Sequence, residues 1–281
     1  MSHNQGLDQA AGLRRMLGPG TIRMISFVSA VSPAQKNQLL QNLAAALVKV
    51  GSEVHLLDAS QSPEGISSCA AAPAPVFLCD INTTQKLVSQ EQNQGIYMSK
   101  LSREPIKQMT DQPKDLENLS AALRELSPTS GFCLIDTQMD NDNPFMLSEV
   151  AAGDVVVLAT NTIDSIKSAY LQIKELHTQL GRRSYQLLVI NASPDQAAKI
   201  QQNMSQAANL FLAVPLISLG CIPSDEHLSR AVQLGRSVIE AFPMAAASIA
   251  FREIATRLAD KPMSINAPSS KPDNHFAKME A

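Results

Sequence analysis

Short hydrophobic runs alternate with amphipathic segments along most of this chain. The hydrophobic runs predict buried strands at residues 22–29, 53–57, 132–135, 155–160, 186–191 and 216–222. Between and after them, apolar residues at helical spacing predict helices at 36–50, 116–126, 165–180, 194–206, 226–234 and 245–258. Such alternation is typical of a mostly parallel sheet with helices on both faces. We therefore predict a single α/β domain over residues 21–260.

Three stretches depart from this alternation. Residues 59–111 are rich first in Ser, Pro and Ala and then in Gln and Asn, with short apolar pieces at 75–78 and 96–98 and a helix predicted at 83–90. Residues 261–281 lack periodicity and predict a disordered tail. Residues 7–17 predict a short helix, closed by Gly-Pro-Gly at 18–20. Because so short a helix is marginal in water, we expect residues 1–20 to dock on the body or on a partner.

Composition narrows the class of protein. A chain of 281 residues with 44% hydrophobic content can bury one large core. The net charge of −3, with only isolated basic pairs, argues against a nucleic-acid partner. The four cysteines (Cys69, Cys79, Cys133 and Cys221) are widely spaced without a CxxC motif. This favours reduced thiols over a disulfide or metal framework. Without a signal sequence or a long apolar span, we expect a soluble cytoplasmic protein without a metal site.

Polar residues that could form a ligand site follow three of the predicted strands. Asp58, Asp136 and Asn191 lie at or just beyond the strand ends, and Lys36 opens a helix at the same edge. Open α/β sheets bind ligands at this edge. An Asp after a strand is also often a simple helix cap, and for Asp58 taken alone that interpretation is favoured. The four positions together favour a binding site.

The stretch between the first strand and its helix has the position of a phosphate-binding P-loop. Residues 30–37 contain no glycine, although glycines normally let backbone N–H groups converge on phosphate there. Pro33 has no N–H to offer, and the side chains of Ser32 and Gln35 occupy space that a phosphate would need. Lys36 is the part of the motif that remains.

From residue 22 to about residue 258 the chain resembles the MinD/ParA family of P-loop ATPases. The matching positions are Ser29, Lys36 and Asn42-Leu43 of a degenerate Walker A motif, Asp58-Ala59-Ser60, Asp136-Thr137-Gln138-Met139-Asp140, Ala152 to Val156, Asn191, and Gly220-Cys221-Ile222-Pro223. The resemblance implies a P-loop NTPase fold. It also implies that Lys36, Asn37, Asp58, Asp136 and Asn191 are remnants of a nucleotide site, in which Asn191 matches the asparagine that reads adenine.

The departures from this family fall on positions that carry its chemistry. Val31 replaces the lysine that reaches across the ATP-bound dimer, and Asn37 replaces the threonine that holds Mg²⁺. Ser60 replaces the aspartate that orients water, and Asp140 replaces a glycine whose N–H senses phosphate. We therefore expect no catalytic residue, no bound cofactor and no hydrolysis. The alternative is a working ATP-dependent dimerisation switch that holds ATP and Mg²⁺ in an unusual geometry.

Residues 8–14 carry a second resemblance. Asp-Gln-Ala-Ala-Gly-Leu-Arg is similar to the Asp-Gln-Ala-x-x-Leu-Arg motif of the FlhG/FleN group of MinD-like flagellar-number regulators. The resemblance implies that Asp8, Gln9, Leu13 and Arg14 bind and stimulate an FlhF-like, signal-recognition-type GTPase. That group also antagonises flagellar transcription activators, which are a second implied partner. An ordinary docked helix remains the alternative. The group's C-terminal membrane helix has no counterpart after Lys261, so membrane association is not expected.

Overall fold

The computed structural model describes residues 22–60, 64–68, 76–80, 90–93, 95–103, 113–126, 131–139 and 144–260. The predicted helix at 7–17, its motif residues, Asp140 and the predicted disordered tail at 261–281 lie outside these ranges. Within them no helix combines the length and hydropathy needed to cross a bilayer.

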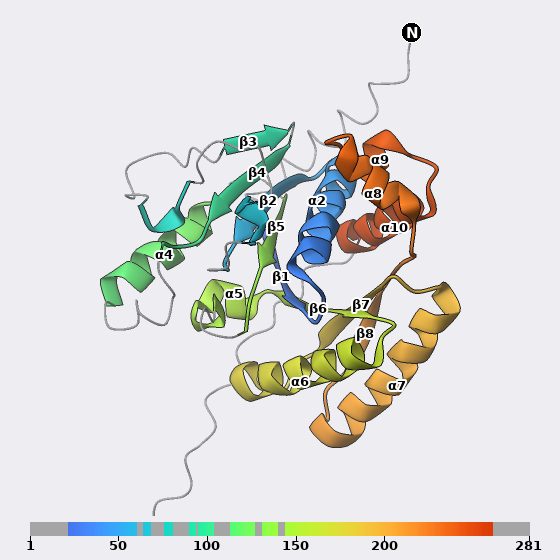
Figure 1. Cartoon of the computed structure of the whole chain (residues 1–281). Coiled ribbons are helices and arrows are strands. Elements are labelled where there is room, and N and C mark those ends of the chain that lie inside the picture. Colours follow the sequence, from blue (N-terminus) through green and yellow to red (C-terminus); the bar gives the residue numbers. More distant parts are fainter. Residues whose placement is uncertain are drawn as a thin grey trace, which may run out of the picture.

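One sheet of eight strands organises the described residues, in the order β3-β4-β2-β5-β1-β6-β7-β8 (Figure 1). The strands are β1 (Arg23–Ser29), β2 (Glu53–Asp58), β3 (Gln90–Asn93), β4 (Ile96–Lys100), β5 (Gly131–Asp136), β6 (Asp154–Thr160), β7 (Tyr185–Ile190) and β8 (Leu216–Ile222). All neighbours pair in parallel except β3, which is antiparallel to β4. The predicted single α/β domain with a mostly parallel sheet is confirmed.

Helices cover both faces of the sheet (Figure 1). On one face lie α2 (Pro33–Lys49), α8 (Glu226–Gln233), α9 (Val238–Ala241) and α10 (Ala246–Asp260). On the other lie α4 (Pro113–Glu125), α5 (Ser148–Ala152), α6 (Ile163–Leu180) and α7 (Pro194–Leu212). Three 3-10 helices complete the elements, η1 (Ile66–Ser68), η2 (Leu78–Asp80) and η3 (Pro144–Met146).

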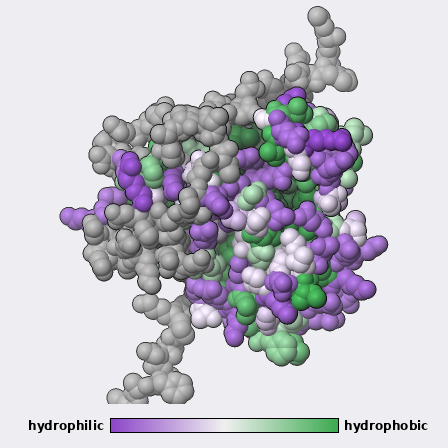
Figure 2. All heavy atoms as spheres, in the orientation of Figure 1, coloured by the Kyte–Doolittle hydropathy of each residue, from purple (hydrophilic) through white to green (hydrophobic). Residues whose placement is uncertain are grey.

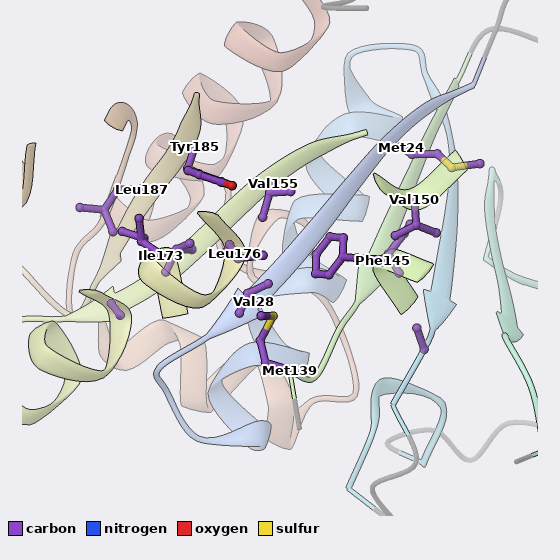
Figure 3. Packing of buried hydrophobic residues seen from close by; sticks show 14 of the residues in the cluster. Met24, Val28, Met139, Phe145, Val150, Val155, Ile173, Leu176, Tyr185 and Leu187 are labelled. Carbon is purple, nitrogen blue, oxygen red and sulfur yellow. The ribbon is translucent and has the colours of Figure 1, made fainter. Parts of the chain in front are cut away.

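The central strand β1 supplies side chains to both core layers. Met24 and Val28 pack on the α4–α7 face, and Ile25 and Phe27 pack on the α2–α10 face. This burial on both faces explains why the hydrophobic residues of β1 include the adjacent pairs 24–25 and 27–28 and do not simply alternate with polar ones. Figure 3 shows the α4–α7 layer, in which Ile173 and other buried residues pack over β1, β6 and β7.

A buried ion pair fixes the beginning of β1. Arg23 donates from Nε to Asp154 Oδ2 at 2.9 Å and from Nη1 to the Leu258 carbonyl at 2.6 Å, and both charged side chains are more than nine-tenths buried. These contacts join the start of β1 to the start of β6 and to the end of α10. The first strand is therefore anchored both to its neighbour β6 and to helix α10.

Several predicted boundaries were wrong, and the reasons are local. Helix α2 begins at Pro33 and not at Lys36, because Ser32 caps it and Pro33 suits its first turn. Gln90, predicted to end a helix, is the first residue of the edge strand β3, and the rest of that prediction lies outside the described ranges. The short helices α5 and α9 were not predicted, and α7 continues to Leu212.

Candidate functional site

The order β2-β5-β1 brings three strand ends together at one edge of the sheet. Asp58 at the end of β2 is paired in register with Asp136 at the end of β5. Asp136 is in turn paired with Phe27 of β1, whose chain continues into α2. The sequence-predicted residues Lys36, Asn37, Asp58 and Asp136 therefore gather at this edge, and all four side chains are buried.

The connection from β1 to α2 is only three residues long, Ala30 to Ser32. Ser32 Oγ accepts from the Gln35 N–H at 3.4 Å, and Gln35 Oε1 accepts from the Ser32 N–H at 3.4 Å. This reciprocal capping box, with Pro33 at the first helical turn, occupies the place of the expected P-loop. The expected loop at 30–37 is therefore shortened to residues 30–32, because residues 33–37 belong to α2.

Lys36 is turned inward and bonded within the chain. Its ammonium group forms an ion pair with Asp136 Oδ1 and donates to the Thr137 carbonyl at 2.5 Å. The lysine is 4% exposed and Asp136 is 3% exposed. A buried cation with both a carboxylate and a carbonyl acceptor has much of its lost hydration replaced.

Residues 64–68 cross over this edge and bond to three of the predicted site residues. The Ile66 N–H donates to Asp136 Oδ2 at 3.1 Å. Asn37 Nδ2 donates to the Glu64 carbonyl at 2.8 Å. Gly65 lies so close to Asp58 that a Cβ atom on it would be 2.6 Å from Asp58 Oδ2. The 64–68 segment therefore covers the carboxylates with its own backbone.

Asp58 is fully buried and accepts hydrogen bonds from two serines. Oδ1 accepts from the N–H and the hydroxyl of Ser60, at 2.9 and 2.8 Å. Oδ2 accepts from the Ser67 N–H at 3.2 Å and also from the Ser67 hydroxyl. Four donors satisfy this carboxylate, so Asp58 holds the loop that follows β2 in place. It does not cap a following α-helix, as the simpler prediction had it.

A cavity of about 130 Å³ remains beside these groups. Lys36, Asn37, Asp136, Ser60 and Gly65 are among its lining residues. Small-molecule sites usually measure about 300–1,000 Å³, so the space suits a few waters and not a nucleotide.

Asn191 lies at a different part of the same sheet edge, just after β7. It lines a pocket of about 300 Å³ between β7, β8, α2, α8 and α10, together with Ile222, Leu228 and Phe251. Its backbone φ of 55° is in the left-handed region, which asparagine tolerates better than most residues. Asn191 also borders an open groove of about 650 Å³ along Ser29 to Ser32. The structure thus separates Asn191 from the Lys36 cluster.

No cluster of three or more His, Cys, Asp or Glu side chains arranged to hold a metal ion occurs among the described residues. Within the same ranges Cys79, Cys133 and Cys221 are free thiols. Burial raises the pKa of Cys133 to about 12, which leaves its thiol protonated at neutral pH.

Sequence reasoning did not find two elements of this site. The Ser32 to Gln35 capping box was readable as an S-x-x-Q pattern with proline in the first turn. No pattern pointed to Ser67 or to the 64–68 segment, because no local periodicity encodes the loop that brings them back over the strand ends. Of the other predicted residues, Asp8, Gln9, Leu13 and Arg14 lie outside the described ranges.

Comparisons with known proteins agree with this architecture. No protein-family model matches the chain. The chain is 25% identical over 258 residues to the antiactivator FleN of Pseudomonas aeruginosa, which covers 90% of this chain and 92% of FleN. It is similar in structure to the MinC:MinD cell division protein complex of Aquifex aeolicus, with a TM-score of 0.62, 18% identity, and 88% and 99% of the two chains covered. A ParA family ATPase from Chlorobium tepidum TLS gives a TM-score of 0.60, 16% identity, and coverage of 85% and 99%.

The two solved structures establish the shared fold, and FleN adds a sequence relationship over most of the chain. The chain therefore has the fold of MinD/ParA-type P-loop ATPases and is similar in sequence to FleN over most of its length.

Proposed function

We propose that this protein is a flagellar regulator of the FlhG/FleN type that acts by binding other proteins, and that its ATPase chemistry is lost. Its N-terminal segment, residues 7–17, engages and stimulates an FlhF-like GTPase. The relative FleN is named an antiactivator, so a flagellar transcription activator is a second class of partner for this chain.

The similarity to FleN and the motif at residues 8–14 support the regulatory part of the proposal. The similarity to FleN extends over 90% of the chain and is not confined to the sheet and its P-loop. The motif lies within residues 7–17, and Gly-Pro-Gly at 18–20 separates that segment from the body. Flagellar-number regulation therefore accounts for both the body and the segment before it, whereas a partitioning or secretion relative leaves the motif without a role.

One observation carries the loss of ATP chemistry: the P-loop lysine is buried in an ion pair with Asp136. A triphosphate would have to break that pair, displace the 64–68 segment and enlarge a cavity of about 130 Å³. The oxygens of both aspartates accept hydrogen bonds from the chain, so these possible oxygen ligands for Mg²⁺ are already engaged. These residues do not fit a bound Mg²⁺-triphosphate group.

Calorimetric titration with ATP and Mg²⁺ tests this part first. We expect no heat of binding at micromolar protein and no ATP turnover above the buffer background. A MinD ATPase measured in parallel shows that the assay detects the activity. Magnesium-dependent turnover that disappears in Lys36→Ala would overturn the proposal.

The rival function, an ATP-dependent dimerisation switch, has one observation in its favour. The pocket beside Asn191 measures about 300 Å³ and borders an open groove, so space for a nucleobase exists although the phosphate end is filled. Light scattering with and without ATP separates the two functions. A shift from monomer to dimer that requires ATP would favour the switch.

A GTPase assay tests the partner. A peptide of residues 1–20 is expected to bind an FlhF-like GTPase with micromolar affinity, because ordering the segment costs part of the binding free energy. Leu13→Ala should weaken binding by about 1–3 kcal/mol through lost apolar contact. Gln9→Ala should reduce stimulation more than affinity if its amide reaches the GTPase site. If the peptide neither binds nor stimulates while the full chain does both, the functional site lies on the body.

A further inference from the structure

An apolar groove runs between α6 and α7 on the outer face of the sheet. It measures about 450 Å³ and is lined by Ile166, Lys167, Tyr170, Leu171, Asn203, Met204 and Ala207. The lining is apolar apart from the lysine and the asparagine. Figure 2 shows hydrophobic residues among paler and polar ones in the lower half of the molecule, where α6 and α7 lie.

The groove continues onto exposed hydrophobic side chains. Leu171 is 62% exposed, Leu210 is 77% exposed and Phe211 is 72% exposed. Leu210 and Phe211 follow Ala207 by three and four residues, so they extend the same side of α7. Single exposed leucines are ordinary, but an apolar groove with three exposed hydrophobics beside it is typical of a docking surface.

We propose that residues 7–17 of the same chain dock in this α6/α7 groove and leave it when a partner takes them. The inference rests on the proposed function, since it concerns the same segment that engages the GTPase. Docking would hide the leucines of the segment and keep it from the GTPase. The α6/α7 groove is then the autoinhibitory site of this regulator.

The place where the chain enters the body favours this occupant. Ile22 packs against the same core layer as Ile166, Tyr170 and Leu212. Ile22 therefore lies on the side of the sheet that α4, α5, α6 and α7 cover. Because both helices run antiparallel to their strands, their C-terminal ends, with Leu210 and Phe211, lie toward the edge where β1 begins.

The linker is long enough to reach the groove. Strand β7, which lies beneath the groove, is two positions from β1, or roughly 10 Å at about 4.8 Å per strand. The helix layer adds roughly another 10 Å. The chain from Leu17 to Ile22 can span up to roughly 18 Å when extended. Leu17 can therefore reach the C-terminal ends of α6 and α7, from which the segment would extend along the groove toward Ile166.

Residues 7–17 carry hydrophobic side chains that would fill the apolar groove. Leu7, Leu13 and Leu17 recur along roughly one side of the predicted helix. A helix of residues 7–17 would be about 16 Å long. This length is close to that of α7 from Met204 to Phe211 plus one further helical turn. An amphipathic helix laid in an apolar groove is a recurrent mode of recognition.

Hydrogen exchange of the full chain, read by mass spectrometry, tests docking without any partner. Amides of residues 7–17 should exchange about tenfold or more slowly in the full chain than in the free peptide of residues 1–20. Leu171→Glu and Phe211→Glu should each return that exchange to the peptide rate. Val232→Glu is the matched control, because Val232 is 61% exposed on α8 and leaves the groove intact.

The outcomes separate this inference from the proposed function. Equal exchange in the full chain and the peptide overturns docking, as does protection that survives both groove substitutions. Protection that disappears on dilution also overturns it, because the occupant would then be a second copy. A GTPase assay that fails while protection is present refutes the proposed partner and leaves docking supported. If both hold, Leu171→Glu should stimulate the GTPase more than Val232→Glu at equal concentration.

Discussion

The strand edge around Lys36 and the outer face of α6 and α7 differ in what their side chains contact. Polar groups at the edge have partners within the chain, whereas hydrophobic groups on the outer face are exposed. At the edge, the lysine and both aspartates are buried and hydrogen-bonded within the chain. On the outer face, Leu171, Leu210 and Phe211 remain in solvent. Buried polar groups with partners gain little from a ligand, whereas exposed apolar surface gains from any suitable cover. The difference favours the α6/α7 face over this strand edge as the surface where a partner would bind.

Of the substitutions that test this contrast, removal of the Asp58 side chain should lower the free energy of unfolding most. Asp58→Ala leaves the donors of Ser60 and Ser67 without their shared acceptor in a fully buried place. We expect a loss of about 3–5 kcal/mol in the free energy of unfolding, measured by urea denaturation at pH 7.5.

Ser26→Ala provides the control for that measurement. Ser26 is also fully buried, but its hydroxyl has no hydrogen-bond partner in the part of the chain that the structure describes. Its removal should change the unfolding free energy by no more than about 0.5 kcal/mol. If the two variants lose equal stability, the carboxylate network does not hold the edge closed.

Gly65→Ala tests how tightly the 64–68 segment lies on the aspartates. A Cβ atom at this position would be 2.5 Å from Ser60 Oγ and 2.6 Å from Asp58 Oδ2. We expect a loss of about 1–3 kcal/mol, because the segment must move off the carboxylates. Faster amide exchange at Ile66 and Ser67 should accompany it, and an unchanged rate there would mean that the segment is not held.

Strand β2 also carries His55, a buried side chain whose titration makes the free energy of unfolding depend on pH. Burial lowers the pKa of His55 from 6.5 to about 4, and its Nε2 lies 2.8 Å from Ser99 Oγ. The unfolded chain takes up the proton first as pH falls, so stability is complete above about 6.5 and declines toward pH 4. The decline between pH 7.5 and 5 should be about 2 kcal/mol and should be absent in His55→Gln. Equal slopes in the two proteins would rule out this origin, and tests of the edge therefore belong above pH 7.

The outer face should show the smallest effect on stability. Leu171→Glu replaces a side chain that is 62% exposed, so its unfolding free energy should stay within about 0.5 kcal/mol of the parent. Circular dichroism melting with Val232→Glu alongside checks this. A loss above about 2 kcal/mol would mean that Leu171 supports the fold and is not part of a docking surface.

Particular residues show what the sequence could predict. Asp58 and Asp136 were predicted at one edge because each ends a hydrophobic run in a strand–helix alternation, and the ends of parallel strands share an edge. The start of α2 was also readable from Ser32, Pro33 and Gln35. It was missed because the position of Lys36 in the family motif suggested a later helix start.

Other features could not be predicted, for physical reasons. Ser67 meets Asp58 only after a loop brings it back over the strand end, and no local periodicity encodes that return. Strand β3 reads Gln-Glu-Gln-Asn, without the hydrophobic alternation that marks a strand. Its pairing with β4 is set by backbone hydrogen bonds at an edge of the sheet.

The capping box at the start of α2 limits which substitutions could create a phosphate-binding loop between β1 and α2. Substitution of Val31 by lysine, or of Asn37 by threonine, would restore one side chain of an ATPase while Pro33 still lacks an N–H and Gln35 still bonds to Ser32. No single substitution rebuilds a loop of converging amides, and each intermediate loses a helix cap worth about 1 kcal/mol before it gains a ligand. Under the proposed loss of ATPase chemistry, its return would therefore need several substitutions at once.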